Sequence, residues 1–183
     1  MTSEESAVVR VADALKACGI DYMLSGSFAS NMYGIPRSTR DADFVLQCRG
    51  GVGEEFCKKL GDGFEFDPQL AFETVTGTYK QLLKQKGTAF QVELFQLSSD
   101  PHDQMRFTRR RPAEVFGRRL WFATPEDVIV TKLRWSRTKD QDDARDVMAV
   151  QRGKLDWSYI EDWCRRHGSL ALMEEIRHSV PEV

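Results

Sequence analysis

The spacing of hydrophobic and polar positions changes about two thirds of the way along the chain. One helical stretch opens the sequence, and short alternating stretches separated by turns run from about residue 20 to residue 97. From residue 124 onward the apolar positions recur at helical intervals. Strands followed by helices predict an α+β fold with a helical C-terminal part.

The N-terminal segment has the signals of a capped helix. Thr2 and Glu5 have the spacing of a capping box, and Gly19 has the place of a C-terminal cap. Apolar residues recur at helical spacing between them, at Val8, Val11, Ala12 and Leu15. A helix over residues 3–18 is therefore predicted, followed by a short strand over residues 20–24.

The second predicted strand, over residues 41–46, has the clearest pattern in the chain. Its apolar positions Ala42, Phe44 and Leu46 alternate with Asp41 and Asp43. Because successive side chains of a strand point to opposite faces, both carboxylates lie on one face and the apolar residues on the other. Extending the alternation backward places Arg37 and Thr39 on the carboxylate face as well.

Further elements follow from the same patterns. Short helices are predicted over residues 27–33 and 53–60, and two or three strands between residues 64 and 97. The last of these, over residues 88–97, alternates Phe90, Val92 and Leu94 with Gln91, Glu93 and Phe95. Glu93 is thereby placed on the face of that strand away from the core.

The C-terminal third is predicted to be entirely helical. Four helices are expected, over residues 125–137, 140–151, 157–167 and 169–178. Thr124, Asp156 and Ser169 stand where N-terminal caps belong. The chain is expected to divide into a core over residues 1–123 and a helical region over residues 124–183 that packs on it.

Composition excludes several classes of protein. The formal charge of −2 gives no overall attraction to nucleic acid or to an anionic membrane. No apolar run approaches the length of about 20 residues that spans a bilayer, and no secretory signal is expected. The four cysteines are scattered, which argues against a zinc site or a disulfide framework: Cys18, Cys48, Cys57 and Cys164. We expect reduced thiols in a cytoplasmic protein.

Two short segments carry the candidate chemistry. Gly26 and Ser27 directly follow the first strand, and Asp41 and Asp43 lie on the second. A Gly-Ser turn presents closely spaced backbone N–H groups that suit a phosphate. Two carboxylates on one face of a strand can share a divalent cation. Together the two segments indicate phosphoryl or nucleotidyl transfer.

Nucleotidyl transfer needs a triphosphate held in line with an acceptor hydroxyl, and cations that neutralise the developing charge. Two Mg²⁺ ions about 3.5 to 4 Å apart do this well. Glu93 is the best candidate for a third carboxylate, which could also help to deprotonate the acceptor, and Glu73 is a weaker rival. The alternative is structural: the acidic positions are the solvent face of a sheet, and Gly26 is only a turn residue.

These segments resemble a known superfamily. They read Gly26-Ser27, Asp41-Ala42-Asp43-Phe44 and Val92-Glu93-Leu94-Phe95. This order resembles the nucleotidyltransferase superfamily typified by DNA polymerase beta, over roughly residues 20–97, with a looser match at residues 124–134. The segment at residues 37–43 and the helical tail resemble a small bacterial branch. That branch includes toxin–antitoxin nucleotidyltransferases of the AbiEii type and aminoglycoside adenylyltransferase-like proteins.

The resemblance implies a mixed β-sheet flanked by helices, and a Mg²⁺-dependent transfer of NMP from an NTP, with ATP as the expected donor. It implies that the catalytic and metal-binding residues, for two Mg²⁺ ions, are Asp41, Asp43 and Glu93. The implied nucleotide-binding residues are Gly26, Ser27, Arg37, Thr39 and Lys132. Glu93 departs from the branch, which more often has aspartate at the third position.

The helical tail holds Lys132 and two acidic residues that could position it. Lys132 is placed by the resemblance at the triphosphate, although an exposed lysine is the alternative. Asp143 and Asp146 are spaced i, i+3 and could position Lys132 or Arg145. The alternative is that acids gather there because they favour a helix N-terminus.

Positive charge is concentrated between the predicted sheet and the helical tail. Six arginines lie there: Arg106, Arg109, Arg110, Arg111, Arg118 and Arg119. They could receive the triphosphate or an acceptor such as RNA, since arginine suits phosphate. A charged surface rim is the alternative.

Two functions from different classes are consistent with these features. The first is an enzyme that transfers NMP to an acceptor that the sequence does not identify: a small molecule, an RNA or a protein. The second is a non-catalytic protein of the same fold that acts as a binding or regulatory partner, for example in a toxin–antitoxin pair. The presence of both Asp41 and Asp43 favours the enzyme.

Overall fold

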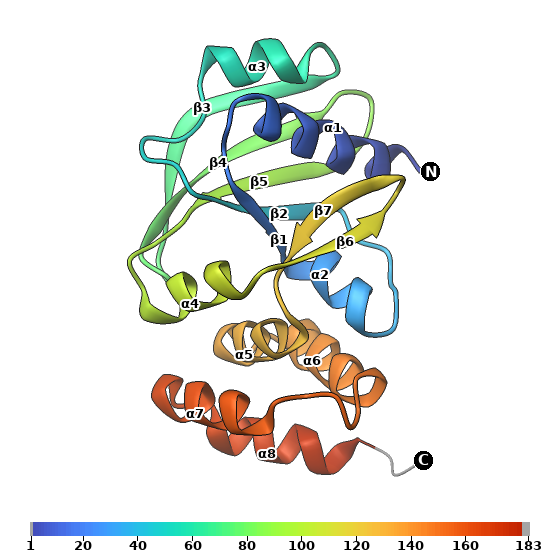
Figure 1. The fold of residues 1–183 in the computed structure, drawn as a ribbon, viewed down its shortest axis with the longest axis vertical. Helices are drawn as coiled ribbons and strands as arrows, with labels where there is room; N and C mark the ends of the chain where they lie inside the picture. Colours follow the sequence, from blue (N-terminus) through green and yellow to red (C-terminus); the bar gives the residue numbers. More distant parts are fainter. Residues whose placement is uncertain (1, 181–183) are drawn as a thin grey trace.

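A computed structural model describes residues 2–180 and contains one mixed sheet (Figure 1). The strands are β1 (Tyr22–Ser25), β2 (Asp41–Leu46), β3 (Phe64–Glu73), β4 (Thr78–Gln85), β5 (Gln91–Gln96), β6 (Arg111–Val115) and β7 (Arg118–Phe122). Their spatial order is β3-β4-β5-β2-β1-β7-β6. The strands β1 and β2 therefore occupy the middle of the sheet.

Helices lie on both sides of this sheet (Figure 1). They are α1 (Ser3–Ala17), α2 (Gly26–Tyr33), α3 (Glu54–Leu60), α4 (Pro101–Arg109), α5 (Pro125–Trp135), α6 (Thr138–Val150), α7 (Trp157–His167) and α8 (Leu170–Ser179). Helices α1 and α3 contact each other on one side, whereas α2 contacts α5 and α6 on the other. The predicted α+β class, with a mixed sheet flanked by helices, is confirmed.

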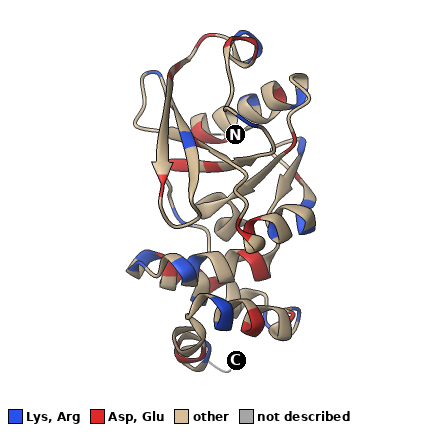
Figure 2. Cartoon of the chain, turned by 90° about the vertical axis from the view of Figure 1, so that its left-hand side faces the viewer, with Lys and Arg blue, Asp and Glu red and all other residues tan. Residues whose placement is uncertain are grey.

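Charged positions of both signs are interspersed along the helices below the sheet (Figure 2). This distribution agrees with the near-neutral formal charge of −2. Within the described residues, every helix is too short or too polar to cross a bilayer. All four cysteines are free thiols.

Strand pairing in the middle of the sheet brings the acidic positions together. β1 pairs with β2 antiparallel, which places Ser25 opposite Asp43. β2 pairs with β5 in parallel, which places Asp43 opposite Glu93. Because directly paired residues point to the same face of a sheet, these side chains lie on one face.

The opposite face of β2 and β5 forms part of the core. Ala42, Phe44 and Leu46 are buried, as are Val92 and Leu94. These are the positions that the period-two pattern assigned to the core. The N-terminal helix is likewise confirmed, since Thr2 and Glu5 form both hydrogen bonds of a capping box.

Three elements were not predicted. The segment of clustered arginines, for which no element was predicted, contains helix α4 and the hairpin β6–β7. The signal for α4 was present, because Asp100 accepts hydrogen bonds from two backbone N–H groups and Pro101 follows it at the first helical position. The backward extension of β2 was wrong: the strand begins at Asp41, so Arg37 and Thr39 precede it.

The helical third follows the prediction closely. Thr124 and Asp156 accept backbone hydrogen bonds as N-caps of α5 and α7, whereas Ser169 makes no side-chain cap at α8. Helix α5 ends at Trp135 because Ser136 adopts the left-handed conformation, at φ 52°. The predicted end of this helix at residue 137 was therefore two residues too late.

Candidate active site

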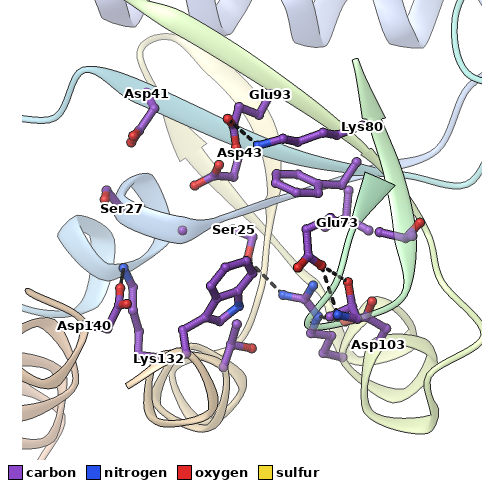
Figure 3. A pocket seen from close by; sticks show the side chains of 18 of the residues that line it. Ser25, Ser27, Asp41, Asp43, Glu73, Lys80, Glu93, Asp103, Lys132 and Asp140 are labelled. Carbon is purple, nitrogen blue, oxygen red and sulfur yellow. Dashed lines mark hydrogen bonds and ion pairs between the residues drawn. The ribbon is translucent and has the colours of Figure 1, made fainter. Parts of the chain in front are cut away.

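A pocket opens where β1, β2 and β5 face helices α4, α5 and α6 (Figure 3). Of the residues singled out from the sequence, it is lined by Gly26, Ser27, Asp41, Asp43, Glu73, Glu93, Arg106 and Lys132. Arg37 and Thr39 do not line it, although each contacts a residue that does. The fold therefore gathers residues from separate segments of the chain around one pocket.

Gly26 is required at its position by both conformation and space. Its φ is +55°, in the left-handed region that side chains disfavour. A Cβ atom placed on Gly26 would lie 1.6 Å from Oδ2 of Asp43. The backbone of the Gly-Ser turn therefore lies directly against the carboxylate of the β2 strand.

The carboxylates of Asp41 and Asp43 both point toward the side on which Ser27 lies (Figure 3). Thr39 donates its hydroxyl to Oδ1 of Asp41 at 2.8 Å, which orients that carboxylate. Burial, reinforced by the negative charges of Glu93 and Asp41, raises the pKa of Asp43 to about 7. The pocket thus concentrates negative charge beside the Gly-Ser turn.

This charge destabilises the folded protein in the absence of a bound cation, so Asp43→Asn is expected to raise the melting temperature. The pKa of Asp43 is about 7 in the folded chain against 3.8 for an unperturbed carboxyl, so stability falls as the pH rises through the interval between these two values, and the full cost is present above pH 7. At pH 8, without divalent cations, we expect a rise on the order of 5 °C.

Thermal unfolding from pH 5 to pH 8 measures this effect. The gain should shrink toward pH 5, because the cost builds up between the unfolded and the folded pKa of Asp43 and only a smaller part of that interval lies below pH 5. Asp142→Asn, at an exposed position on α6, is the matched control and should leave the melting temperature unchanged. An equal gain at pH 5 and pH 8 would contradict the argument.

Glu93 lies beside Asp43 but is held by a lysine. Its Oε1 accepts a hydrogen bond from Nζ of Lys80 at 2.7 Å, and the ammonium also lies 5.3 Å from the ring centre of Phe95. The carboxylate is turned toward Lys80 in Figure 3. Lys80 was not singled out from the sequence, because only the pairing of β4 with β5, in which Lys80 is opposite Phe95, brings it diagonally beside Glu93.

Glu73, the weaker rival for the third carboxylate, also lines the pocket. Its carboxylate accepts hydrogen bonds from the backbone N–H groups of Val75 and Thr76 and from the Thr76 hydroxyl. These contacts hold the turn between β3 and β4. Both carboxylate oxygens of Glu73 are therefore used in hydrogen bonds to the turn that follows it.

The donor set beside Gly26 suits a hard divalent cation. Asp41 and Asp43 offer carboxylate oxygens, the ligands that Mg²⁺ prefers, and a cation there would offset the charge that raises the pKa of Asp43. Among residues 2–180, no three His, Cys, Asp or Glu side chains are grouped so as to hold a metal ion together. The fit therefore rests on the two aspartates, and Glu93 as a third ligand stays a prediction.

Lys132 is a buried cation rather than an exposed one. Its Nζ lies 2.7 Å from Oδ2 of Asp143 and 3.1 Å from Oδ1 of Asp140. Asp140 was not among the predicted residues, although it lies in the acidic run at the start of α6. Asp146 makes no such contact with Lys132. Asp140 and Asp143 therefore bind a buried lysine, in addition to any stabilisation that they give to the N-terminus of α6.

Arg37 connects this cluster to the Gly-Ser turn. Its guanidinium makes two hydrogen bonds to Asp143, at 2.6 and 2.8 Å, and a third to Oγ of Ser27 at 3.2 Å. Burial opposes ionisation of Asp143, but hydrogen bonds from Arg37 and Lys132 outweigh it and hold the pKa of this carboxyl below its ordinary value. The loop before β2 is thereby tied to α6.

The clustered arginines contact different parts of the protein. Arg109 lies 3.3 Å from Asp127 and packs its guanidinium over Tyr159 at 4.0 Å, so it joins α4 to α5 and α7. Arg110 stacks on Phe107, and Arg118 pairs with Asp13. Of the six arginines, Arg106 lines the pocket. These four arginines make separate contacts, and a role of the cluster in receiving an acceptor stays a prediction.

Comparison with protein families decides which group the chain belongs to. Residues 4–174 match the family described as "Nucleotidyl transferase of unknown function (DUF2204)". The chain belongs to this family. It is therefore a nucleotidyltransferase, in agreement with the resemblance drawn from Gly26-Ser27 and Asp41-Ala42-Asp43. No curated protein matches the chain in sequence.

Solved structures of similar fold agree with this assignment. The antibiotic-resistance factor ANT(2'')-Ia in solution has a TM-score of 0.59 at 13% identity, over 96% of this chain and 97% of that one. ANT(2'')-Ia in complex with adenylyl-2''-tobramycin has a TM-score of 0.56 at 12% identity, over 92% and 98%. The lincomycin-bound lincosamide antibiotic adenylyltransferase LnuA has a TM-score of 0.52 at 12% identity, over 82% and 98%. At such identities the likeness shows a shared fold.

Proposed function

We propose that this nucleotidyltransferase transfers AMP from ATP to a hydroxyl group of an acceptor molecule in a Mg²⁺-dependent reaction. The observation that carries the proposal is the contact between the Gly26 backbone and Asp43, with Asp41 and Ser27 on the same side of the pocket. In this proposal the turn binds the anion and the neighbouring carboxylate pair binds the cation. Such an arrangement suits a triphosphate that binds together with its metal ion.

Each group in the pocket has a role in this proposal. The backbone N–H groups of Gly26 and Ser27 would bind the triphosphate, aided by the charge of Lys132. Asp41 and Asp43 would hold Mg²⁺, which when bound neutralises the charge that develops on the leaving pyrophosphate. Arg37 supports Ser27 and Asp143 through its hydrogen bonds.

Glu93 is the proposed third carboxylate. It lies beside Asp43, where it could accept the proton of the acceptor hydroxyl. Its contact with Lys80 fixes the orientation of the carboxylate. Thr39 would act indirectly, by orienting Asp41.

The acceptor is proposed to be a small hydroxyl-bearing molecule. The neighbours in fold include a protein complexed with adenylyl-2''-tobramycin and an adenylyltransferase bound to lincomycin. Their names also support ATP as the donor. An RNA or a protein as acceptor is kept as an outcome of the experiment.

The proposal predicts label transfer that depends on both aspartates. The protein is incubated with Mg²⁺ and each NTP labelled at the α-phosphate, together with pools of aminoglycosides and lincosamides, total RNA or cell protein. We expect labelled small-molecule product with ATP, and a loss of about a thousandfold or more in Asp41→Asn and in Asp43→Asn, since both would hold the cation.

Asp142→Asn, at an exposed carboxylate on α6, serves as the control and should keep full activity. Label on RNA or protein instead would replace the proposed acceptor while retaining the reaction. If no NTP gives label with any acceptor, or if the aspartate variants label as well as the native protein, the catalytic proposal is wrong. A non-catalytic binding partner, as in a toxin–antitoxin pair, would then be favoured.

A further inference from the structure

Ser25 occupies the N-cap position of helix α2 without capping it. A serine at this position ordinarily accepts a hydrogen bond from the backbone N–H of the second or third helical residue. In α2 these residues are Ser27 and Phe28, and the side chain of Ser25 makes no such bond. Its Oγ instead accepts a hydrogen bond from Nη1 of Arg106 at 2.9 Å (Figure 3).

Arg106 is itself held rigidly in the interior. Only 6% of the residue is exposed, and its Nε donates to Oδ1 of Asp103 at 2.7 Å. The other oxygen of Asp103 accepts a hydrogen bond from the hydroxyl of Ser98 at 2.5 Å. A buried chain of contacts therefore runs from the loop before α4, through Arg106, to the end of β1.

The consequence lies at the first turn of α2. The first four N–H groups of a helix have no partner within it, and they attract anions when no side chain satisfies them. Gly26 and Ser27, which carry the first two of these groups, line the same pocket as Asp41 and Asp43. If the Ser25 hydroxyl turned back to cap the helix, an incoming phosphate would have to displace it.

We propose that Arg106 is a positioning residue that withholds the Ser25 cap, so that the N-terminus of α2 stays free to bind the triphosphate. This inference rests on the proposed function, because it assigns that anion to the same turn. Arg106 acts through Ser25 and needs no contact with the nucleotide. A cap of ordinary strength that competes with the anion would weaken its binding about tenfold.

The test first removes the hydrogen bond from Arg106 to Ser25, and then removes the Ser25 hydroxyl that could cap the helix. Arg106→Met is combined with Asp103→Asn so that no unpaired carboxylate stays buried. Binding of inorganic tripolyphosphate, measured by calorimetry, should be about tenfold weaker in this double variant. Adding Ser25→Ala should restore binding to within about threefold of the native value, because alanine cannot cap the helix.

Amide hydrogen exchange supplies a second readout that needs no ligand. The N–H groups of Ser27 and Phe28 should exchange rapidly in the native protein. At least one should be protected in the double variant, and it should exchange rapidly again once Ser25→Ala is added. Circular dichroism and thermal unfolding establish that each variant is folded.

Specific outcomes would overturn the inference. If the triple variant binds tripolyphosphate as weakly as the double variant, Arg106 binds the anion directly and the positioning role is wrong. If neither Ser27 nor Phe28 gains protection in the double variant, Ser25 does not compete as a cap. Failure of the proposed function has a different signature, because the native protein would bind neither tripolyphosphate nor ATP although the exchange pattern holds.

Discussion

Gly26→Ala is expected to lower the rate of nucleotidyl transfer by about a hundredfold or more, since a displacement of about 1 Å at a reacting centre has effects of that size. The added Cβ would lie 1.6 Å from Oδ2 of Asp43, so the carboxylate or the turn must move. The φ of +55° adds backbone strain to the steric conflict. The change therefore affects the proposed anion-binding turn and the proposed cation-binding pair together.

Single-turnover transfer and ATP binding by calorimetry measure this effect. Both should fall, while the circular dichroism spectrum stays native because the change is confined to the pocket. Gly53→Ala is the matched control: Gly53 has a φ of −134°, and no atom lies within 4 Å of an added Cβ. If Gly26→Ala keeps more than about a tenth of native activity, the close packing of turn and carboxylate is not needed for transfer.

Lys132→Met is expected to lower both stability and ATP binding. The lysine side chain is buried between Asp140 and Asp143, whose side chains are 1% and 4% exposed. Its removal leaves two buried carboxylates without their shared ammonium, and breaking a buried ion pair costs about 3 kcal/mol or more. For a chain of this size, the melting temperature should fall by about 6 to 12 °C.

Thermal unfolding and calorimetric titration with ATP measure the two effects. Lys154→Met, at an exposed position, should leave both unchanged. In Lys132→Met/Asp140→Asn one of the uncompensated charges is also removed, so part of the lost stability should return while ATP binding stays weak. Arg137 also pairs with Asp140, its Nε lying 2.6 Å from Oδ2 of that residue. A melting temperature unchanged by Lys132→Met would show that Arg37, at Asp143, and Arg137, at Asp140, suffice to balance the two aspartates.

The local parts of the site could be predicted because their signals are local. Alternation along β2 placed Asp41 and Asp43 on one face, and strand geometry alone enforces that arrangement. The Gly-Ser turn was recognisable because a strand ending in glycine and a following helix are both short-range features. The order of these two segments then sufficed to identify the superfamily.

Prediction failed where the signal was weak or conflicting. Helix α4 was missed because its arginines interrupt the helical pattern of apolar positions. Asp100 and Pro101 were nevertheless signals of a helix N-terminus. Asp140 was passed over because acids are common at helix N-termini for electrostatic reasons. Neither residue type nor spacing distinguishes an acid that favours the helix dipole from one that binds a buried lysine.

Other contacts join segments that no local pattern relates. Arg106 reaches Ser25 across 81 positions, and Arg37 reaches Asp143 across 106. Lys80 meets Glu93 because β4 and β5 pair in one particular register. Each of these contacts depends on a sheet order and a helix packing that the spacing of residues does not encode.

The sequence by itself determined the class of fold, the boundaries of most elements and the two segments that mark a nucleotidyltransferase. These depend on the periodicity of strands and helices and on backbone geometry, which act over a few residues. Only the tertiary structure decided which charges are paired, which face the pocket and which cap is withheld. Burial and partner distance set those properties, and both arise only when distant segments pack together.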